Sequence, residues 1–173
     1  MHRAATYGLN GTAAQESRLE TALQEGRPVI CAVDDDDLSA SVVATAATLA
    51  SGLDVPLIVV HSPHPDVYLT GEPHLAAIER GHRLLDRLTD GYRVDERVVE
   101  VDEPGRLITE LARDRASMIV VGTRQRTGLR AAILGSVSHA VIAGASCPVL
   151  TVSASGSSAL EGEPTDVARP SAA

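Results

Sequence analysis

The chain has 173 residues, 44% of them hydrophobic, which suits one globular domain with tails. Its net charge of −8 argues against a nucleic-acid partner held through phosphate contacts. All 15 basic residues are arginine, so Schiff-base catalysis and a P-loop lysine are excluded. No apolar run approaches the ~18 residues of a membrane span and no signal peptide opens the chain. We therefore expect a cytoplasmic protein without a membrane partner.

Short apolar runs and helical patterns alternate along the chain. Residues 1–26 are mixed and polar, and we predict an N-terminal extension outside the main core, partly helical or flexible, with a helix over 15–24. Five apolar runs follow that are typical of buried strands: 29–33, 57–60, 98–101, 118–121 and 148–152. Helices are predicted between them: 38–49, which Gly52 ends as a C-cap, 75–88, the segment that Pro104 opens, and the segment from Ser136.

This alternation predicts the fold class. Strands without polar alternation are buried on both faces, so we expect an α/β fold with a doubly wound five-stranded parallel sheet and helices on both faces, over residues 27–153. Residues 154–173 have few large apolar side chains, and we predict a disordered tail. No charge lies between Cys147 and Val152, so the last strand, Pro148 to Val152, has an unguarded edge. Such an edge invites pairing with a second copy, and we predict a homodimer through it.

Three of the predicted strands end in residues suited to a ligand site. Asp34 follows the first strand, His61 ends the second and Gly122 ends the fourth. Parallel strands bring these ends to one edge of the sheet, where ligands bind at the switch point of doubly wound folds.

The loop after the fourth strand favours an anion. Gly122 lets the chain turn off the strand, and Gly135 lets a ligand approach the backbone of the following helix. Ser136 can donate its hydroxyl to a phosphate oxygen. The loop between carries three arginines, Arg124, Arg126 and Arg130. On spacing alone, an equally good interpretation is that both glycines are turn residues and Ser136 is an N-cap.

The acidic run from Asp34 to Asp37 has three interpretations. It could bind a divalent cation, as in a receiver domain, but that fold also needs a lysine, which this chain lacks. Asp34 could hydrogen-bond the ribose or base of a ligand, while the other carboxylates favour the helix N-terminus. Asp36 or Asp37 could also do no more than cap the helix.

No other motif indicates catalysis or a metal. The histidines lack metal-ligand spacing, and neither Gly-x-Ser-x-Gly nor Gly-x-Gly-x-x-Gly is present, so the sequence shows no hydrolytic or redox machinery. Cys31 and Cys147 lie in strand-like runs and are expected to be reduced core residues.

Residues 27–152 resemble a universal stress protein domain. The first strand ends in Val33-Asp34 and the second in His61-Ser62. Near its end, the region of resemblance contains a Cys-Pro-Val-Leu run at 147–150. Nucleotide-binding members of that family carry Gly-x2-Gly-x9-Gly-Ser/Thr. This sequence has Gly122, Thr123, Arg124 and Gln125, nine residues, and then Gly135, Ser136, Val137 and Ser138.

The resemblance implies a dimeric, stress-responsive regulator that binds ATP, with or without Mg²⁺, and contacts an unidentified regulatory protein. Asp34 and the backbone around Ser62 are expected to hold adenosine. Gly122, Gly135, Ser136 and Ser138 are expected to hold ribose and phosphates. The implied nucleotide-binding set is Val33, Asp34, Ser62, Gly122, Thr123, Arg124, Gln125, Gly135, Ser136, Val137 and Ser138.

Two residues depart from the family pattern. Gln125 replaces the second motif glycine, and Asp102 stands where the family commonly has a glycine before Pro104. A left-handed backbone at position 125 would cost about 1–2 kcal/mol with a side chain present. Our leading hypothesis is therefore an ATP-binding, non-enzymatic regulator, and the alternative is a dimeric interaction module with a vestigial pocket. A nucleotide hydrolase is less well supported, because no positioned base is visible.

Overall fold

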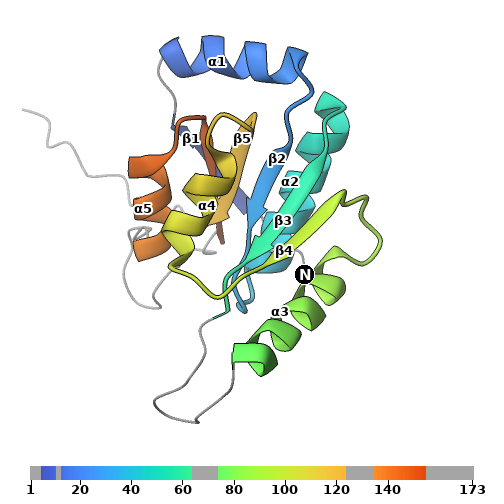
Figure 1. Ribbon diagram of the computed structural model, residues 1–173. Coiled ribbons are helices and arrows are strands. Elements are labelled where there is room, and N and C mark those ends of the chain that lie inside the picture. Colours follow the sequence, from blue (N-terminus) through green and yellow to red (C-terminus); the bar gives the residue numbers. More distant parts are fainter. Residues whose placement is uncertain (1–4, 11–12, 64–73, 124–134, 155–173) are drawn as a thin grey trace, which may run out of the picture.

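The computed structural model describes residues 5–10, 13–63, 74–123 and 135–154 (Figure 1). The helices and strands alternate as expected, with one additional strand at the beginning of the chain. In order they are β1 (Ala5–Asn10), α1 (Ala13–Gln24), β2 (Val29–Ala32), α2 (Ser39–Leu53), β3 (Leu57–His61), α3 (His74–Thr89), β4 (Glu96–Val99), α4 (Pro104–Ala112), β5 (Met118–Gly122), α5 (Ser136–Gly144) and β6 (Val149–Ala154).

The strands form one sheet in the order β1-β6-β5-β2-β3-β4. The strands β2 to β6 are parallel, and β1 pairs antiparallel with β6. Helices α2 and α3 pack on one face, and α4 and α5 pack on the other (Figure 1). The predicted doubly wound α/β fold with five parallel strands is confirmed, and β1 adds a sixth strand to it.

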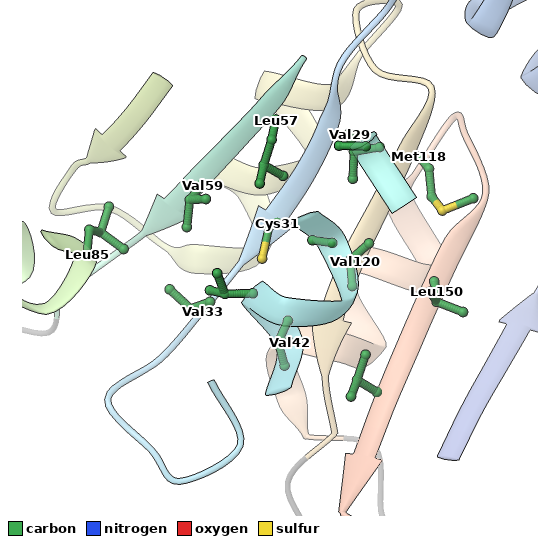
Figure 2. Close-up of a cluster of buried hydrophobic side chains, with 14 residues drawn as sticks. Val29, Cys31, Val33, Val42, Leu57, Val59, Leu85, Met118, Val120 and Leu150 are labelled. Carbon is green, nitrogen blue, oxygen red and sulfur yellow. The ribbon is translucent and has the colours of Figure 1, made fainter. Parts of the chain in front are cut away.

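Alternate residues of β2 explain why its sequence is apolar throughout. Val29 and Cys31 face α2 and α3, in a cluster that includes Val42 and Leu85 from those helices (Figure 2). Ile30 belongs to a second cluster under α4 and α5. The strand is thus buried on both sides, which is the pattern that predicted a parallel sheet.

Both cysteines are free and buried, as predicted. Burial raises the pKa of the Cys147 thiol to about 11, and it also raises the pKa of Cys31, which has no exposed surface. Both side chains therefore stay protonated near neutral pH and act as small apolar core residues. Among the described residues, no helix is long and apolar enough to cross a membrane.

The N-terminal segment differs from the predicted extension outside the core. Strand β1 joins the sheet, and Ala22 of α1 is only 4% exposed. Leu19 packs against the core cluster under α2, and Arg18 Nη1 donates to Ser146 O at 3.4 Å.

The prediction that β6 has an open edge is also wrong, because β1 occupies that edge over six residue pairs. Of the predicted tail, only Ala154 lies within the described residues.

Two predicted boundaries are wrong for identifiable physical reasons. The strand expected at 98–101 is β4, Glu96–Val99, an edge strand whose first two residues are exposed and so leave no apolar signal. Gly52 was predicted to end α2, but the helix continues to Leu53. Its C-cap is Asp54, in the left-handed conformation at φ 53°. Asp is one of the few residues other than glycine that adopt this conformation readily.

Gly81 allows α3 to approach the sheet closely, and we predict that Gly81→Ala destabilises the fold. A Cβ there would lie 2.6 Å from Val99 Cγ1 and 3.2 Å from His61 Cδ2. The matched control is Gly52→Ala, because a Cβ at Gly52 in α2 meets nothing within 4 Å. Chemical denaturation should show a loss of about 1–2 kcal/mol for Gly81→Ala and a gain of about 0.5–1 kcal/mol for Gly52→Ala. Equal effects of the two substitutions would contradict this account of the α3 contact.

Candidate functional site

A pocket of about 960 Å³ opens at the carboxyl edge of the sheet, above β2 and β5. From β2 the chain continues to β3 and β4 on one side, whereas β5 and β6 lie on the other, so the pocket is at the switch point of the sheet. The described lining comes from the ends of the strands and the starts of α2 to α5: Ala32, Val33, Asp34, Asp36, Ser39, Val42, Val60, Ser62, Pro63, His74, Val101, Asp102, Glu103, Pro104, Leu107, Ile108, Val121, Gly122, Gly135, Ser136, Val137 and Ser138.

The turn between β2 and α2 is held by its own side chains. Asp36 Oδ1 accepts hydrogen bonds from the backbone N–H groups of Leu38 at 3.1 Å and Ser39 at 3.0 Å, and from Ser39 Oγ at 2.9 Å. Ser39 Oγ also contacts the backbone of Asp34, whose carboxylate accepts from the N–H of Asp35. The N-cap residue of α2 is Leu38, without a side-chain cap bond, and Asp36 instead accepts the N–H groups of Leu38 and Ser39 from just before it. The turn presents Asp34 to the pocket.

The opposite wall is formed by the segment before α4. Ser62 Oγ donates to the carbonyl of Asp102 at 2.7 Å, which ties the end of β3 to this segment. Glu103 is the N-cap of α4 and accepts from the N–H groups of Gly105 and Arg106, while Pro104 occupies the first turn. This wall thus places two further carboxylates at the pocket, neither of them part of the predicted site.

Asp102 is held in its charged form. Its carboxylate accepts from the N–H of Glu103 and pairs with the guanidinium of Arg106, and these interactions, in that order of size, hold the Asp102 pKa below its usual range. Arg106 also pairs with Glu110. Asp102 is not among the residues with positive φ, so its replacement of a glycine carries no left-handed strain.

The third wall is the N-terminus of α5. Gly135 is its N-cap, with an extended backbone and no side-chain hydrogen bond to the helix. The first N–H groups of a helix have no intrahelical acceptor, and the helix dipole is positive there. Ser136 is exposed, and among the described residues its hydroxyl has no hydrogen-bond partner. Donors are therefore concentrated on this side of the pocket.

The predicted site residues fall into three groups. The first group lines the pocket and comprises Val33, Asp34, Ser62, Gly122, Gly135, Ser136, Val137 and Ser138. Thr123 is buried instead, and both its N–H and its hydroxyl donate to Val152 O. Arg124 and Gln125 lie outside the described residues.

Two predicted ligand contacts have structural roles in this arrangement. Ser138 is buried, and its hydroxyl donates to Gly122 O at 2.7 Å, so it joins α5 to β5. A Cβ at Gly122 would lie 3.1 Å from Leu38 Cδ2 and 3.2 Å from Val42 Cγ2. Gly122 does not have a positive φ, so the close packing of α2 explains this glycine better than a sharp turn does.

The pocket contains residues that sequence reasoning did not assign to the site. His74, Asp102 and Glu103 line it, with the apolar side chains of Leu107 and Ile108. The sequence could have assigned Asp102 to the site, because Asp102 follows a predicted parallel strand and therefore lies at the same edge of the sheet as Asp34. His74 begins α3, after a segment that has no sequence pattern linking it to the sheet edge.

His61 is bonded to Val33, one of the residues that line the pocket. The ring is buried, and Nδ1 lies 3.0 Å from Val33 O. A carbonyl only accepts, so Nδ1 carries the hydrogen of this bond. The bond holds the ends of β2 and β3 together. Within the described ranges, no group of three or more His, Cys, Asp or Glu side chains is arranged to hold a metal ion.

A comparison with protein families shows to which family this chain belongs. One family model, described as the universal stress protein family, matches residues 26–153. The chain belongs to the universal stress protein family. A universal stress protein of Mycobacterium tuberculosis is 33% identical over 131 residues, covering 71% of this chain but 44% of the relative. The chain thus spans under half the length of that relative. Bacillus subtilis YxiE is 30% identical over 145 residues, covering 72% of this chain and 97% of YxiE.

Solved universal stress protein structures share the fold. That of the Archaeoglobus fulgidus protein in complex with dAMP is 29% identical with a TM-score of 0.58, and it covers 73% of this chain and 97% of its own. A universal stress protein in complex with cAMP is 27% identical with a TM-score of 0.52, covering 75% of this chain and 98% of its own. These two neighbours were thus solved with an adenine nucleotide, dAMP in one and cAMP in the other.

We predict that Arg106→Gln raises the Asp102 pKa only part of the way to its ordinary value. The hydrogen bond from the Glu103 N–H, which contributes most, remains in the variant, whereas the bond and charge of Arg106 are lost. A carboxyl NMR titration measures this directly, and Arg113→Gln at the exposed end of α4 is the matched control. Because the folded pKa is depressed, the stabilising effect of Asp102 is present above its unfolded pKa and is lost as the pH falls through the folded value. An unchanged Asp102 pKa in Arg106→Gln would show that the pair does not persist in solution.

Proposed function

We propose that this chain is a non-enzymatic stress-response regulator that binds an adenine nucleotide, ATP in particular, in the pocket at the carboxyl edge of the sheet. The observation that carries the proposal is the polarity of the pocket. Asp34 supplies acceptors on the wall between β2 and α2, Asp102 supplies them on the wall before α4, and the uncapped N-terminus of α5 supplies donors on the third wall. The dAMP and cAMP complexes of related proteins support the choice of an adenine nucleotide.

The chemistry of a nucleotide matches this division. Ribose hydroxyls and the adenine amino group are hydrogen-bond donors, which suit carboxylates, whereas the phosphates are anions that suit backbone N–H groups. The described residues that line the pocket include no arginine that could offset the negative charge of Asp34. Phosphates placed beside Asp34 would therefore be repelled. We therefore orient the nucleotide with adenosine toward Asp34 and the phosphates toward Ser136. A volume of about 960 Å³ is at the upper end of the usual range for ligand sites.

The regulatory role completes the proposal. No lysine is present in the chain, and we propose binding without turnover. Any Mg²⁺ that accompanies ATP would be carried by its phosphates. The nucleotide state would change a contact with another protein in the cytoplasm. Sustained ATP hydrolysis by the purified protein would replace this proposal with that of a hydrolase.

A second candidate function is an interaction module whose pocket no longer binds. Gln125 in place of a glycine favours it, because a side chain at that position can strain the backbone or obstruct the phosphates. Both candidates include a homodimer through the last strand. That dimer is a proposal, and because β1 occupies the edge of β6, β1 has to leave this edge before two copies can pair through it.

We predict that calorimetry detects ATP binding at micromolar strength and that Ser136→Ala weakens it. The exposed Ser136 hydroxyl sits in the first turn of α5, and a lost hydrogen bond to a phosphate is expected to reduce affinity about tenfold, or about 1.4 kcal/mol. The matched control is Ser51→Ala, since Ser51 is an exposed serine of α2 outside this pocket. Equal affinities for Ser136→Ala and Ser51→Ala would contradict the assigned phosphate position.

A separate substitution distinguishes the two candidate functions. If the pocket binds but is weakened by strain at position 125, Gln125→Gly should tighten ATP binding about 5- to 30-fold, which corresponds to about 1–2 kcal/mol. If the wild type shows no binding but Gln125→Gly does, that side chain is the cause of a vestigial pocket. If neither form binds any adenine nucleotide, the nucleotide proposal fails and the interaction module remains.

A further inference from the structure

The outer edge of β6 is covered by a strand from the beginning of the same chain. Strand β1 runs antiparallel to β6, with Thr6 opposite Ser153, Gly8 opposite Thr151 and Asn10 opposite Val149. It stands at the end of the sheet order, so among the described strands β6 is its single neighbour.

The hydrogen bonds of β5 fix which groups of β6 point toward β1. The N–H of Ile119 donates to Pro148 O at 3.0 Å, and the N–H of Thr123 donates to Val152 O at 2.8 Å. Because the N–H and C=O of one strand residue point the same way and alternate along the strand, residues 148, 150 and 152 face β5. Val149, Thr151 and Ser153 therefore direct their backbone groups toward β1.

The same three residues are arranged to pair with a second copy of the chain. In a two-fold antiparallel pairing centred on Thr151, Thr151 meets its own equivalent, and Val149 meets Ser153 of the partner subunit. The partner's Ser153, Thr151 and Val149 would take the places that Asn10, Gly8 and Thr6 hold in the intact fold. A two-fold dimer requires this self-complementary arrangement. The strand carries no charge that would oppose it.

We propose that β1 is an intramolecular cap on a dimerisation edge, so that the intact chain is a monomer and release of β1 allows two copies to pair through β6. This inference rests on the homodimer proposed above and is independent of nucleotide binding. The cap can leave without unfolding α1, because α1 has its own contacts. Ala22 is buried, Leu19 packs against the core, and Arg18 bonds to the segment before β6.

The test uses prolines in the full-length chain. Thr6→Pro with Gly8→Pro removes the two N–H groups that point toward β6, whereas Tyr7→Pro with Leu9→Pro removes N–H groups that point away from it. Both double variants carry two prolines in the same strand, so the second is the matched control. Sedimentation velocity at micromolar concentration should give a monomer for the wild type and for the control. It should give twice that mass for Thr6→Pro with Gly8→Pro.

Adding Thr151→Pro to the first double variant should return it to a monomer, because the Thr151 N–H is needed for pairing with the second copy. If all variants are monomeric, the dimer itself is absent and the inference falls with it. If the wild type is already dimeric through β6, the dimer stands but β1 is not its cap. A chain lacking residues 1–10 is the second way to remove the cap. Loss of the folded state in both uncapped forms would also overturn the inference, since a cap has to be removable.

Discussion

The candidate site depends on the parallel alignment of β2, β3, β5 and β6. Because these strands run the same way, their carboxyl ends and the turns into the following helices gather at one edge. The change of winding direction beside β2 separates the helices that start on either side, and this leaves the pocket. Asp34 and the N-terminus of α5 are about a hundred residues apart in sequence and meet only because of this topology.

Several contacts at this edge serve the fold rather than a ligand. The bond between His61 and Val33 joins two strand ends, and Ser138 binds the carbonyl of Gly122. Asp36 accepts the N–H groups of Leu38 and Ser39 at the start of α2. Their carbonyl and carboxylate partners are thereby satisfied internally, which fixes the pocket walls before any ligand arrives. Preorganisation of this kind lowers the entropic cost of binding.

Sequence reasoning predicted the parallel core well and its margins poorly. Central strands such as β2 are buried on both faces, so their apolar runs are unambiguous. Edge strands lack that signal. Glu96 and Arg97 open β4, and β1 is a six-residue segment of mixed polarity whose pairing depends on a partner about 140 residues away. The residues predicted for a site were those that belong to a motif, such as Asp34 and Gly135, and both line the pocket. Asp102 carries no motif, and only the sheet topology brings it to the pocket.

The most direct test of the account is a crystal structure of the protein grown with saturating ATP. The account predicts a nucleotide in the pocket between β2 and β5, with its ribose beside Asp34 and its phosphates at the backbone N–H groups of Ser136 and Val137. An empty pocket at saturating ATP would contradict it. So would a nucleotide bound elsewhere, or one with its phosphates beside Asp34 or beside Asp102.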